Sequence, residues 1–202
     1  TVATAGGKTE KMVLKEYQMS LDINDRWDKQ ITISNESDNP LFVTLFEEGI
    51  PLDDCVKTSA NGIELTRNFY NDQGQSISPE MIKQGDQFWI RYRVRSLTGE
   101  YLTQLALSSL IPSGWELINF RLSEEEQPGW LGNYNLSWGT YMDLRDDRVN
   151  WFFDLGHRAE SNFFVKCNAT FKGTYRLPPV TVEPMYSPDY YARIGGGTAV
   201  VE

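Results

Sequence analysis

Alternation of apolar and polar residues in short segments constrains the fold of this chain more than any other feature of its sequence. A period of two is the pattern of a β-strand with one buried face. One such strand is predicted over residues 149–155, whose apolar side consists of Val149, Trp151, Phe153 and Leu155. The clearest alternation covers residues 88–95, with Phe88, Ile90, Tyr92 and Val94 predicted inward and Trp89, Arg91, Arg93 and Arg95 outward. Arginines on one face of an acidic chain are interpreted as a solvated surface paired with nearby carboxylates.

Further strands are predicted at close spacing along the rest of the chain. They cover Ile63–Tyr70, Tyr101–Ile111, Trp115–Leu122, Phe163–Phe171, Val180–Glu183 and Thr198–Val201. Turns rich in Gly and Pro separate them, such as residues 71–74, where Gly74 allows a positive φ. Helical periodicity is almost absent. This combination predicts an all-β protein with an antiparallel β-sandwich.

The first 61 residues are organised differently from the rest. Residues 1–11 are polar and are predicted to be a frayed lead, whereas residues 29–35 and 41–46 are predicted to pair as a β-hairpin. A polar connection over residues 51–61 ends at the turn signal Asn61-Gly62. We therefore divide the chain into a short lead with β-strands entering from a preceding domain, 1–61, and a sandwich, 62–202. The polar start without Met leads us to expect a piece of a longer precursor.

Composition argues against several classes of partner. The 202 residues are 40% hydrophobic and 13% aromatic, which is enough for a substantial core. The formal charge is −9 and the sequence has no basic stripe for phosphates, so neither nucleic acid nor an anionic membrane is expected to bind. No apolar run has the length of a membrane span, and the first residues lack the apolar core of a signal peptide. We expect no membrane contact by these residues.

Metal, cofactor and enzymatic chemistry are not predicted. The two cysteines, Cys55 and Cys167, lack metal-ligand spacing, and the single histidine, His157, has no cluster to join. No Gly-x-Ser-x-Gly motif is present, and neither cysteine has a credible base partner. Cys167 lies on the apolar side of the strand predicted at 163–171, which favours a buried, inert thiol, while a disulfide with Cys55 stays open. We expect no enzyme, no metal site and no cofactor.

Charge is concentrated just before the strand at 149–155. The charged residues there are Asp143, Arg145, Asp146, Asp147 and Arg148. Three aspartates would suit calcium, which takes several oxygen ligands, but the arginines between and after them would compete with the cation. Planar guanidinium–carboxylate pairs are predicted instead. The segment is interpreted as a polar, self-paired corner that leads into a core strand.

A long aromatic loop interrupts the strand pattern at residues 123–140. It begins with the acidic run Glu124–Glu126 and carries Trp130, Tyr134 and Trp138 among glycines and asparagines. Loops of this length in compact domains are often functional. One hypothesis is therefore a carbohydrate-binding β-sandwich module, in which Trp130, Tyr134 and Trp138 stack on sugar rings.

Four motifs in a fixed order carry a resemblance to a known family. They are Pro112-Ser-Gly-Trp-Glu116, Asp143-Leu-Arg-Asp-Asp-Arg-Val149, Tyr175-Arg-Leu-Pro-Pro-Val180 and Glu183-Pro-Met-Tyr-Ser-Pro188. Together they resemble the C-terminal end of bacterial alpha-2-macroglobulins. The resemblance is strongest over 62–202 and implies the last macroglobulin-like domain, a sandwich of the immunoglobulin and fibronectin type III kind. Residues 12–60 resemble the strands that follow the family's thioester domain.

The resemblance implies a protease trap located in the cell envelope, on its periplasmic or extracellular side. In that family a bait region is cleaved, the molecule rearranges, and members with a thioester capture the protease covalently. A thioester needs Cys with Gln three positions on, but Thr58 follows Cys55 at that distance and Thr170 follows Cys167. These residues therefore carry no trapping chemistry. The sequence leaves open whether the parent protein has a thioester.

The resemblance also implies a role for the pair Met185 and Tyr186. In the family the last domain packs against the thioester domain, and the Met-Tyr pair is the candidate contact that keeps the native state closed. The alternative is that both side chains cover the core of their own sandwich. The expected partners are therefore other domains of the same parent chain, with target proteases reached only through the intact parent. The motif at Arg145, Asp146, Asp147 and Arg148 is interpreted as a structural corner.

Overall fold

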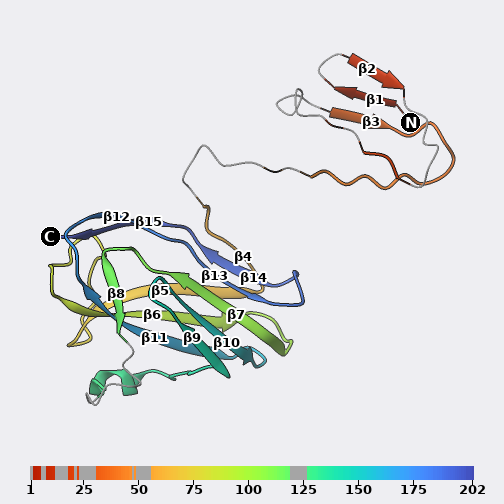
Figure 1. Ribbon diagram of the computed structural model, residues 1–202. Helices are drawn as coiled ribbons and strands as arrows, with labels where there is room; N and C mark the ends of the chain where they lie inside the picture. The colour runs from red at the N-terminus through yellow and green to blue at the C-terminus, as the bar shows by residue number, and fades with distance from the viewer. Residues whose placement is uncertain are drawn as a thin grey trace. The chain divides into compact units, whose positions relative to one another are not determined.

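The computed structural model describes residues 2–5, 8–11, 18–20, 22, 31–46, 48, 56–118 and 127–202 (Figure 1). The chain divides into two compact units, Thr1–Leu52 and Asp53–Glu202. Cys55 and the acidic run Glu124–Glu126 lie outside the described residues, as does most of the segment 12–30.

The first unit contains a three-stranded antiparallel sheet in the order β2-β1-β3. Its strands are β1 (Val2–Ala5), β2 (Lys8–Lys11) and β3 (Ile31–Ser34). The prediction of a frayed lead over residues 1–11 is therefore wrong, because these residues form two of the strands. The predicted hairpin is also wrong: β3 pairs with β1, and residues 41–46 form no strand. Alternation marks a segment as strand-like, but it does not choose the neighbouring strand.

The turn after β3 is closed by side chains. Asn35 donates a hydrogen bond from Nδ2 to the carbonyl of Asn39 at 2.6 Å, and its Oδ1 accepts from the Ser37 backbone at 3.2 Å. Such local bonding by Asn favours turns. Beyond this turn, Phe42 and Phe46 are about nine-tenths exposed. The predicted turn is present, although the strand expected to follow it is not.

The second unit is a β-sandwich. Its larger sheet has the order β4-β14-β13-β7-β10-β9, and its smaller sheet the order β5-β6-β11-β8, with a separate two-stranded ladder β12-β15. All the paired ladders are antiparallel (Figure 1). The larger sheet consists of β4 (Ser59–Asn61), β14 (Tyr191–Ile194), β13 (Val180–Pro184), β7 (Leu102–Leu110), β10 (Arg148–Leu155) and β9 (Tyr141–Leu144). The remaining strands are β5 (Ile63–Asn71), β6 (Gln87–Ser96), β11 (Glu160–Ala169), β8 (Trp115–Ile118), β12 (Gly173–Leu177) and β15 (Gly197–Val201). The predicted all-β sandwich is confirmed.

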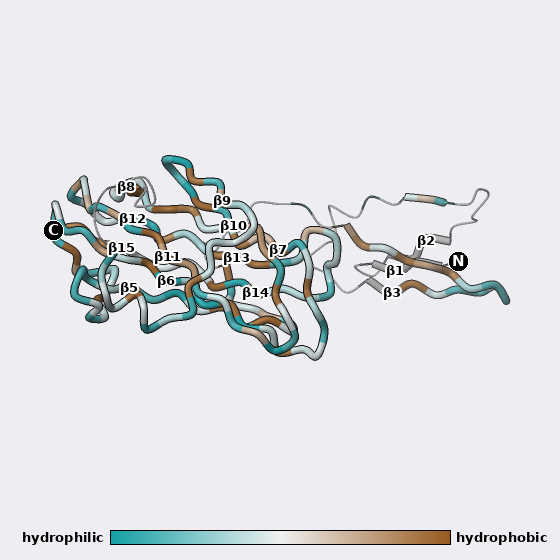
Figure 2. The backbone as a smooth tube through the Cα atoms, turned by 90° about the horizontal axis from the view of Figure 1, so that it is seen from below, coloured by the Kyte–Doolittle hydropathy of each residue, from teal (hydrophilic) through white to brown (hydrophobic). Residues whose placement is uncertain are grey.

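The core lies between the two sheets and is strongly aromatic. Trp151 of β10 contacts Tyr92 of β6 and Phe163 of β11, with ring centroids 5.4 Å apart in both cases. The Tyr92 hydroxyl shares a hydrogen bond of 2.8 Å with the Ser109 hydroxyl of the opposite sheet, so this buried polar group is satisfied. Along the strands of this unit, brown apolar positions alternate with paler ones (Figure 2). The inward sides predicted for residues 88–95 and 149–155 are confirmed by their burial.

Some details differ from the sequence prediction. The connection predicted at 51–61 contains β4, which pairs with β14 at the edge of the larger sheet. Trp89, predicted to face solvent, is only 1% exposed, because the loop at 128–138 covers it. Phe171, predicted on the buried side of its strand, is 58% exposed because β11 ends at Ala169.

Candidate functional site

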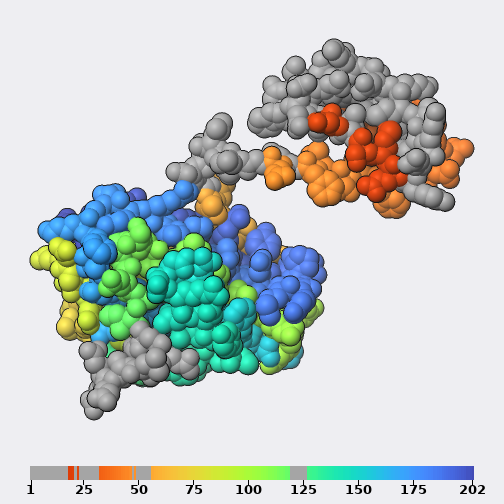
Figure 3. All heavy atoms as spheres, in the orientation of Figure 1, coloured from red at the N-terminus to blue at the C-terminus, as the bar shows by residue number. Residues whose placement is uncertain are grey.

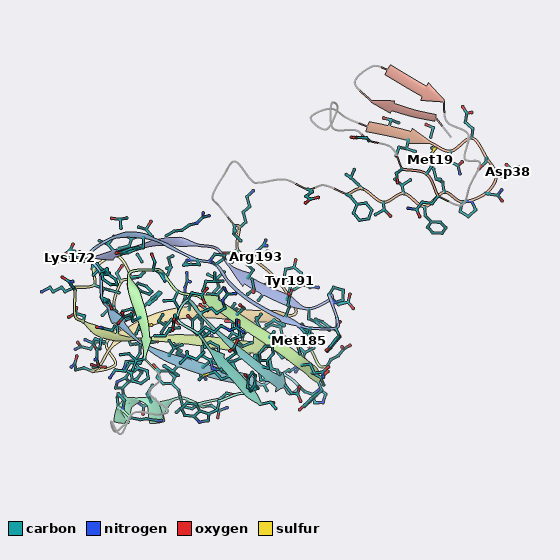
Figure 4. The ribbon with its side chains drawn as sticks, viewed as in Figure 1. Met19, Asp38, Lys172, Met185, Tyr191 and Arg193 are labelled. Atoms are coloured by element: carbon teal, nitrogen blue, oxygen red, sulfur yellow. The ribbon has the colours of Figure 1, made fainter. Side chains whose placement is uncertain are left out.

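The loop between β13 and β14 presents two exposed apolar side chains. Met185 is 45% exposed and Tyr186 is 79% exposed. Met185, labelled in Figure 4, is the first residue after β13. Residues near the C-terminus, blue in Figure 3, form a large part of the visible surface of this unit. Because Tyr186 is largely exposed, its side chain does not cover the core of its own sandwich.

The same loop is held firmly where it returns to β14. The Tyr190 hydroxyl donates to Glu100 Oε2 at 2.9 Å, and Asn61 Nδ2 donates to the Asp189 carbonyl at 2.6 Å. The hydrogen bond to Glu100 raises the pKa of Tyr190. Gly62 has a φ of +71°, and a Cβ there would lie 2.5 Å from the Tyr190 ring, so only glycine fits this approach. The exposed Met-Tyr tip is thus carried on an anchored loop.

The charged corner forms the turn of the hairpin β9–β10. Arg145 Nε donates to Asp143 Oδ2 at 2.9 Å, while Arg148 holds Asp147 with two bonds, Nε to Oδ1 at 3.0 Å and Nη2 to Oδ2 at 2.6 Å. The hydrogen bond from Arg148 lowers the pKa of Asp147. Asp146 is exposed at the tip of the turn. The predicted guanidinium–carboxylate pairs are present, so two of the three aspartates that would suit a cation already hold arginines.

The arginine face of β6 is paired with carboxylates, as the sequence predicted. Arg93 donates from Nε to Glu160 Oε2 at 2.7 Å and from Nη1 to Glu64 Oε1 at 3.1 Å. Arg95 also contacts Glu64, and Arg91 lies 3.8 Å from Glu160. These pairs join the three strands β5, β6 and β11 across one sheet face. The hydrogen bond from Arg93 lowers the pKa of Glu160 below its ordinary value of 4.5.

Unfolding at acid pH is expected to depend on Glu160. Because the folded state lowers the pKa of this carboxyl, its contribution to stability is present above the unfolded pKa and is lost as the pH falls through the folded value. The urea midpoint of Glu160→Gln should therefore change less than that of the wild type between about pH 6 and pH 3. Glu116→Gln, at an exposed position of β8, is the matched control. Parallel pH curves for Glu160→Gln and the wild type would contradict the prediction.

The aromatic loop is a strap across the outer face of the smaller sheet. It contains the 3-10 helix η2 (Gly129–Asn133), and Trp130 and Tyr134 pack against buried Trp89 and Phe164. Beyond the helix, the Ser137 backbone N–H donates to the Asn162 carbonyl of β11 at 2.8 Å. We call residues 128–138 the aromatic strap.

Two indole groups fasten this region to the turn after β5. Trp89 Nε1 donates to Asp72 Oδ1 and Trp130 Nε1 donates to the Asp72 carbonyl, both at 2.9 Å. Gly74 in the same turn has a φ of +77°, and a Cβ there would lie 2.7 Å from the Trp130 ring. Large apolar residues at outward positions of neighbouring strands, Trp89 and Phe164, were the signal in the sequence that could have predicted a segment covering this face of the sheet.

The three residues of the carbohydrate hypothesis do not form a flat platform. The rings of Trp130 and Tyr134 are 6.2 Å apart and nearly perpendicular, at 86°. Tyr134 also lies under the Arg91 guanidinium, 4.2 Å from its ring centre, and Trp138 packs against the same cluster. Stacking on a sugar needs exposed, coplanar rings, so this geometry adds no support to the carbohydrate hypothesis.

Cys167 and His157 lie in different surroundings. Cys167 is a free thiol that lies buried, as expected from its place on the apolar side of the strand, and burial raises its pKa. His157 is exposed in the turn before β11, and its Nδ1 lies 2.8 Å from the Gly99 carbonyl. Within the described ranges, no three His, Cys, Asp or Glu side chains are grouped as a metal would need. Nor do those ranges contain a helix with the length and apolarity to cross a bilayer.

These features define a class of domain: a β-sandwich with a paired charged corner, a packed aromatic strap and one anchored loop with an exposed Met-Tyr tip. Residues 62–189 match the profile described as the bacterial alpha-2-macroglobulin MG10 domain. The chain belongs to the bacterial alpha-2-macroglobulin family. The family resemblance inferred from the four sequence motifs is thereby confirmed.

Individual relatives agree with this assignment. The alpha-2-macroglobulin of Pasteurella multocida is 27% identical over 80% of this chain, and that of Rickettsia conorii is 26% identical over 96%. The trypsin-activated structure from Escherichia coli superposes with a TM-score of 0.65 at 22% identity, covering 72% of this chain and 11% of that one. The cryo-EM structure of the native conformation of the E. coli protein also superposes with a TM-score of 0.65, at 22% identity, covering 78% of this chain and 10% of that one. The chain spans only 8 and 10% of the length of the two relatives named first.

Proposed function

We propose that this chain is a non-catalytic domain of a protease-trapping parent protein and that it holds the native state of that parent closed. The exposed pair Met185 and Tyr186 carries the proposal. Tyr186 is 79% exposed although it is a large aromatic residue in a family motif, and its loop is anchored at Glu100, Asn61 and Gly62. An ordered loop with an apolar tip loses little conformational entropy when another domain covers it.

The chemistry of the tip suits a contact that excludes water. The Met and Tyr side chains would cover apolar area on a partner domain, and the Met thioether has almost no hydrogen-bonding capacity. We propose that the partner is another domain of the same parent chain, the thioester domain where the parent has one. Target proteases would reach this domain only through that parent. The cell envelope, on its periplasmic or extracellular side, is the compartment in which we place it.

Replacing Tyr186 with alanine in the intact parent should release the closed state. Truncating an aromatic residue that is a hot spot of an interface costs about 2 kcal/mol or more, roughly thirtyfold in an equilibrium or rate. The Tyr186→Ala parent should therefore convert to the rearranged form faster at a given dose of protease, as followed by native gel electrophoresis. Met185→Ala should act in the same direction.

Tyr141→Ala is the matched control, because Tyr141 is 62% exposed on β9 and lies outside the loop. It should leave the transition of the parent unchanged. Unchanged conversion in both Met185→Ala and Tyr186→Ala would refute the proposed closure.

A further inference from the structure

A β-bulge in β7 lies beside the Met-Tyr tip. Strand β7 runs between β10 and β13 in the larger sheet. Its pairing with β10 shifts after the pair Leu105–Phe153, so that Thr103 and Gln104 both lie opposite Asp154. An extra residue of this kind disrupts the ladder locally and leaves backbone groups in need of other partners.

Gln104 occupies the bulge in a conformation that is uncommon for residues other than glycine. Its φ is +54°, in the left-handed region. In an extended strand, the N–H and C=O of one residue point toward the same neighbouring strand. At Gln104 they serve opposite neighbours: the N–H donates to Asp154 Oδ1 in β10 at 2.8 Å, and the C=O accepts from the Met185 N–H at 3.0 Å.

Asp154 is thus linked to Met185 through the N–H and C=O groups of Gln104. Its carboxylate replaces the ladder partner that the bulge removes, and an ionised acceptor makes a strong hydrogen bond to a backbone N–H. The Gln104 carbonyl accepts from the N–H of Met185, the first residue beyond β13, at the position that follows the pair Pro184–Leu105 along the two strands. Together with Tyr190 and Asn61 at the other end, the bulge gives the loop an anchor on each side.

We propose that Asp154 and Gln104 are positioning residues that set the conformation of the Met185–Tyr186 tip. The inference rests on the proposed function for its biological consequence, but the anchor itself can be measured without it. Neither residue belongs to the four motifs of the family resemblance, and Asp154 acts only through Gln104. Its loss should loosen the tip while the sandwich stays folded.

Amide hydrogen exchange of the 202-residue chain, measured by NMR, tests the anchor. In Asp154→Ala, exchange of the Met185 amide should accelerate about three- to tenfold, the range of one net hydrogen bond. Exchange of the Trp151 amide in the core should stay at the wild-type rate. Asp154→Asn keeps a side-chain oxygen as acceptor and should restore most of the protection. Glu183→Ala, which removes an exposed carboxylate of β13, should have no effect.

Three results would overturn the anchor: an unchanged exchange rate of the Met185 amide in Asp154→Ala, an equal effect of Glu183→Ala, or a parallel rise in the exchange rate of the Trp151 amide.

The intact parent separates this inference from the proposed function. If Asp154→Ala and Tyr186→Ala both hasten the protease-triggered transition, both proposals are supported. If Asp154→Ala loosens Met185 but Tyr186→Ala leaves the transition unchanged, the anchor stands and the proposed closure fails. If only Tyr186→Ala acts and Met185 exchange is unaltered, the closure stands and the anchor fails.

Discussion

Replacing Trp151 with alanine is expected to lower the free energy of unfolding of the second unit by about 3–5 kcal/mol, the range for truncating a large buried aromatic residue. Trp151 is 1% exposed and contacts Tyr92 and Phe163 of the facing sheet, so its removal leaves a cavity at the centre of the sandwich. Urea denaturation followed by circular dichroism measures the change without relying on tryptophan fluorescence.

Tyr141→Ala provides the comparison on the neighbouring strand. Its ring is exposed and stacks on Phe152, 5.9 Å away, on the outer side of the hairpin. Its loss should cost less than about 1 kcal/mol. A similar loss of stability in Trp151→Ala and Tyr141→Ala would contradict the assignment of Trp151 to the core.

Replacing Trp130 with alanine should produce the second largest effect, a loss of about 2–4 kcal/mol. The indole fills the space between the Gly74 turn and the outer sheet face, contacts Tyr70, Trp89 and Phe164, and donates to the Asp72 carbonyl. Removing it should expose the apolar residues beneath the aromatic strap. Urea denaturation, combined with binding of a hydrophobic dye, measures both consequences.

Trp130→Phe is the graded variant, because it keeps a ring but loses the hydrogen bond to Asp72. Trp130→Phe should lower the free energy of unfolding by about 1 kcal/mol for the lost hydrogen bond, plus the contribution of the part of the ring that is removed. Phe171→Ala, at an exposed aromatic outside the strap, should be nearly neutral. If Trp130→Ala were as stable as the wild type, the structural role of the strap would be refuted. A glycan titration monitored by tryptophan fluorescence would then be the decisive test of the carbohydrate hypothesis.

The local pattern was sufficient for most of the sandwich. Alternation at 88–95 and 149–155 identified the inward side of β6 and β10, because a buried face requires apolar residues at a period of two. The self-paired corner at 143–148 was also predictable, since its acids and arginines lie within a few residues of each other. Ordered motifs were enough to recognise the family, which the match over residues 62–189 confirms.

Only the identity of the two residues at the candidate site was predictable from the sequence, not how the structure holds them. The sequence indicated Met185 and Tyr186 through a motif, but not that the Met185 backbone bonds Gln104, more than eighty positions earlier in the chain. No local signal marks Gln104 as a bulge residue, because glutamine has no preference for a positive φ. Its conformation follows from the register of β7 against both of its neighbours.

The sequence by itself determined the class of fold, the main core strands, the charged corner and the family. Only the tertiary structure decided which strands are neighbours: β1 beside β3, β4 beside β14, and β7 between β10 and β13. It also decided that Trp89 is covered by the strap and that the Met-Tyr tip is held from β7. The physical reason is that alternation reports the burial of each strand's two faces, whereas partners across a sheet are selected by contacts between residues distant in the chain.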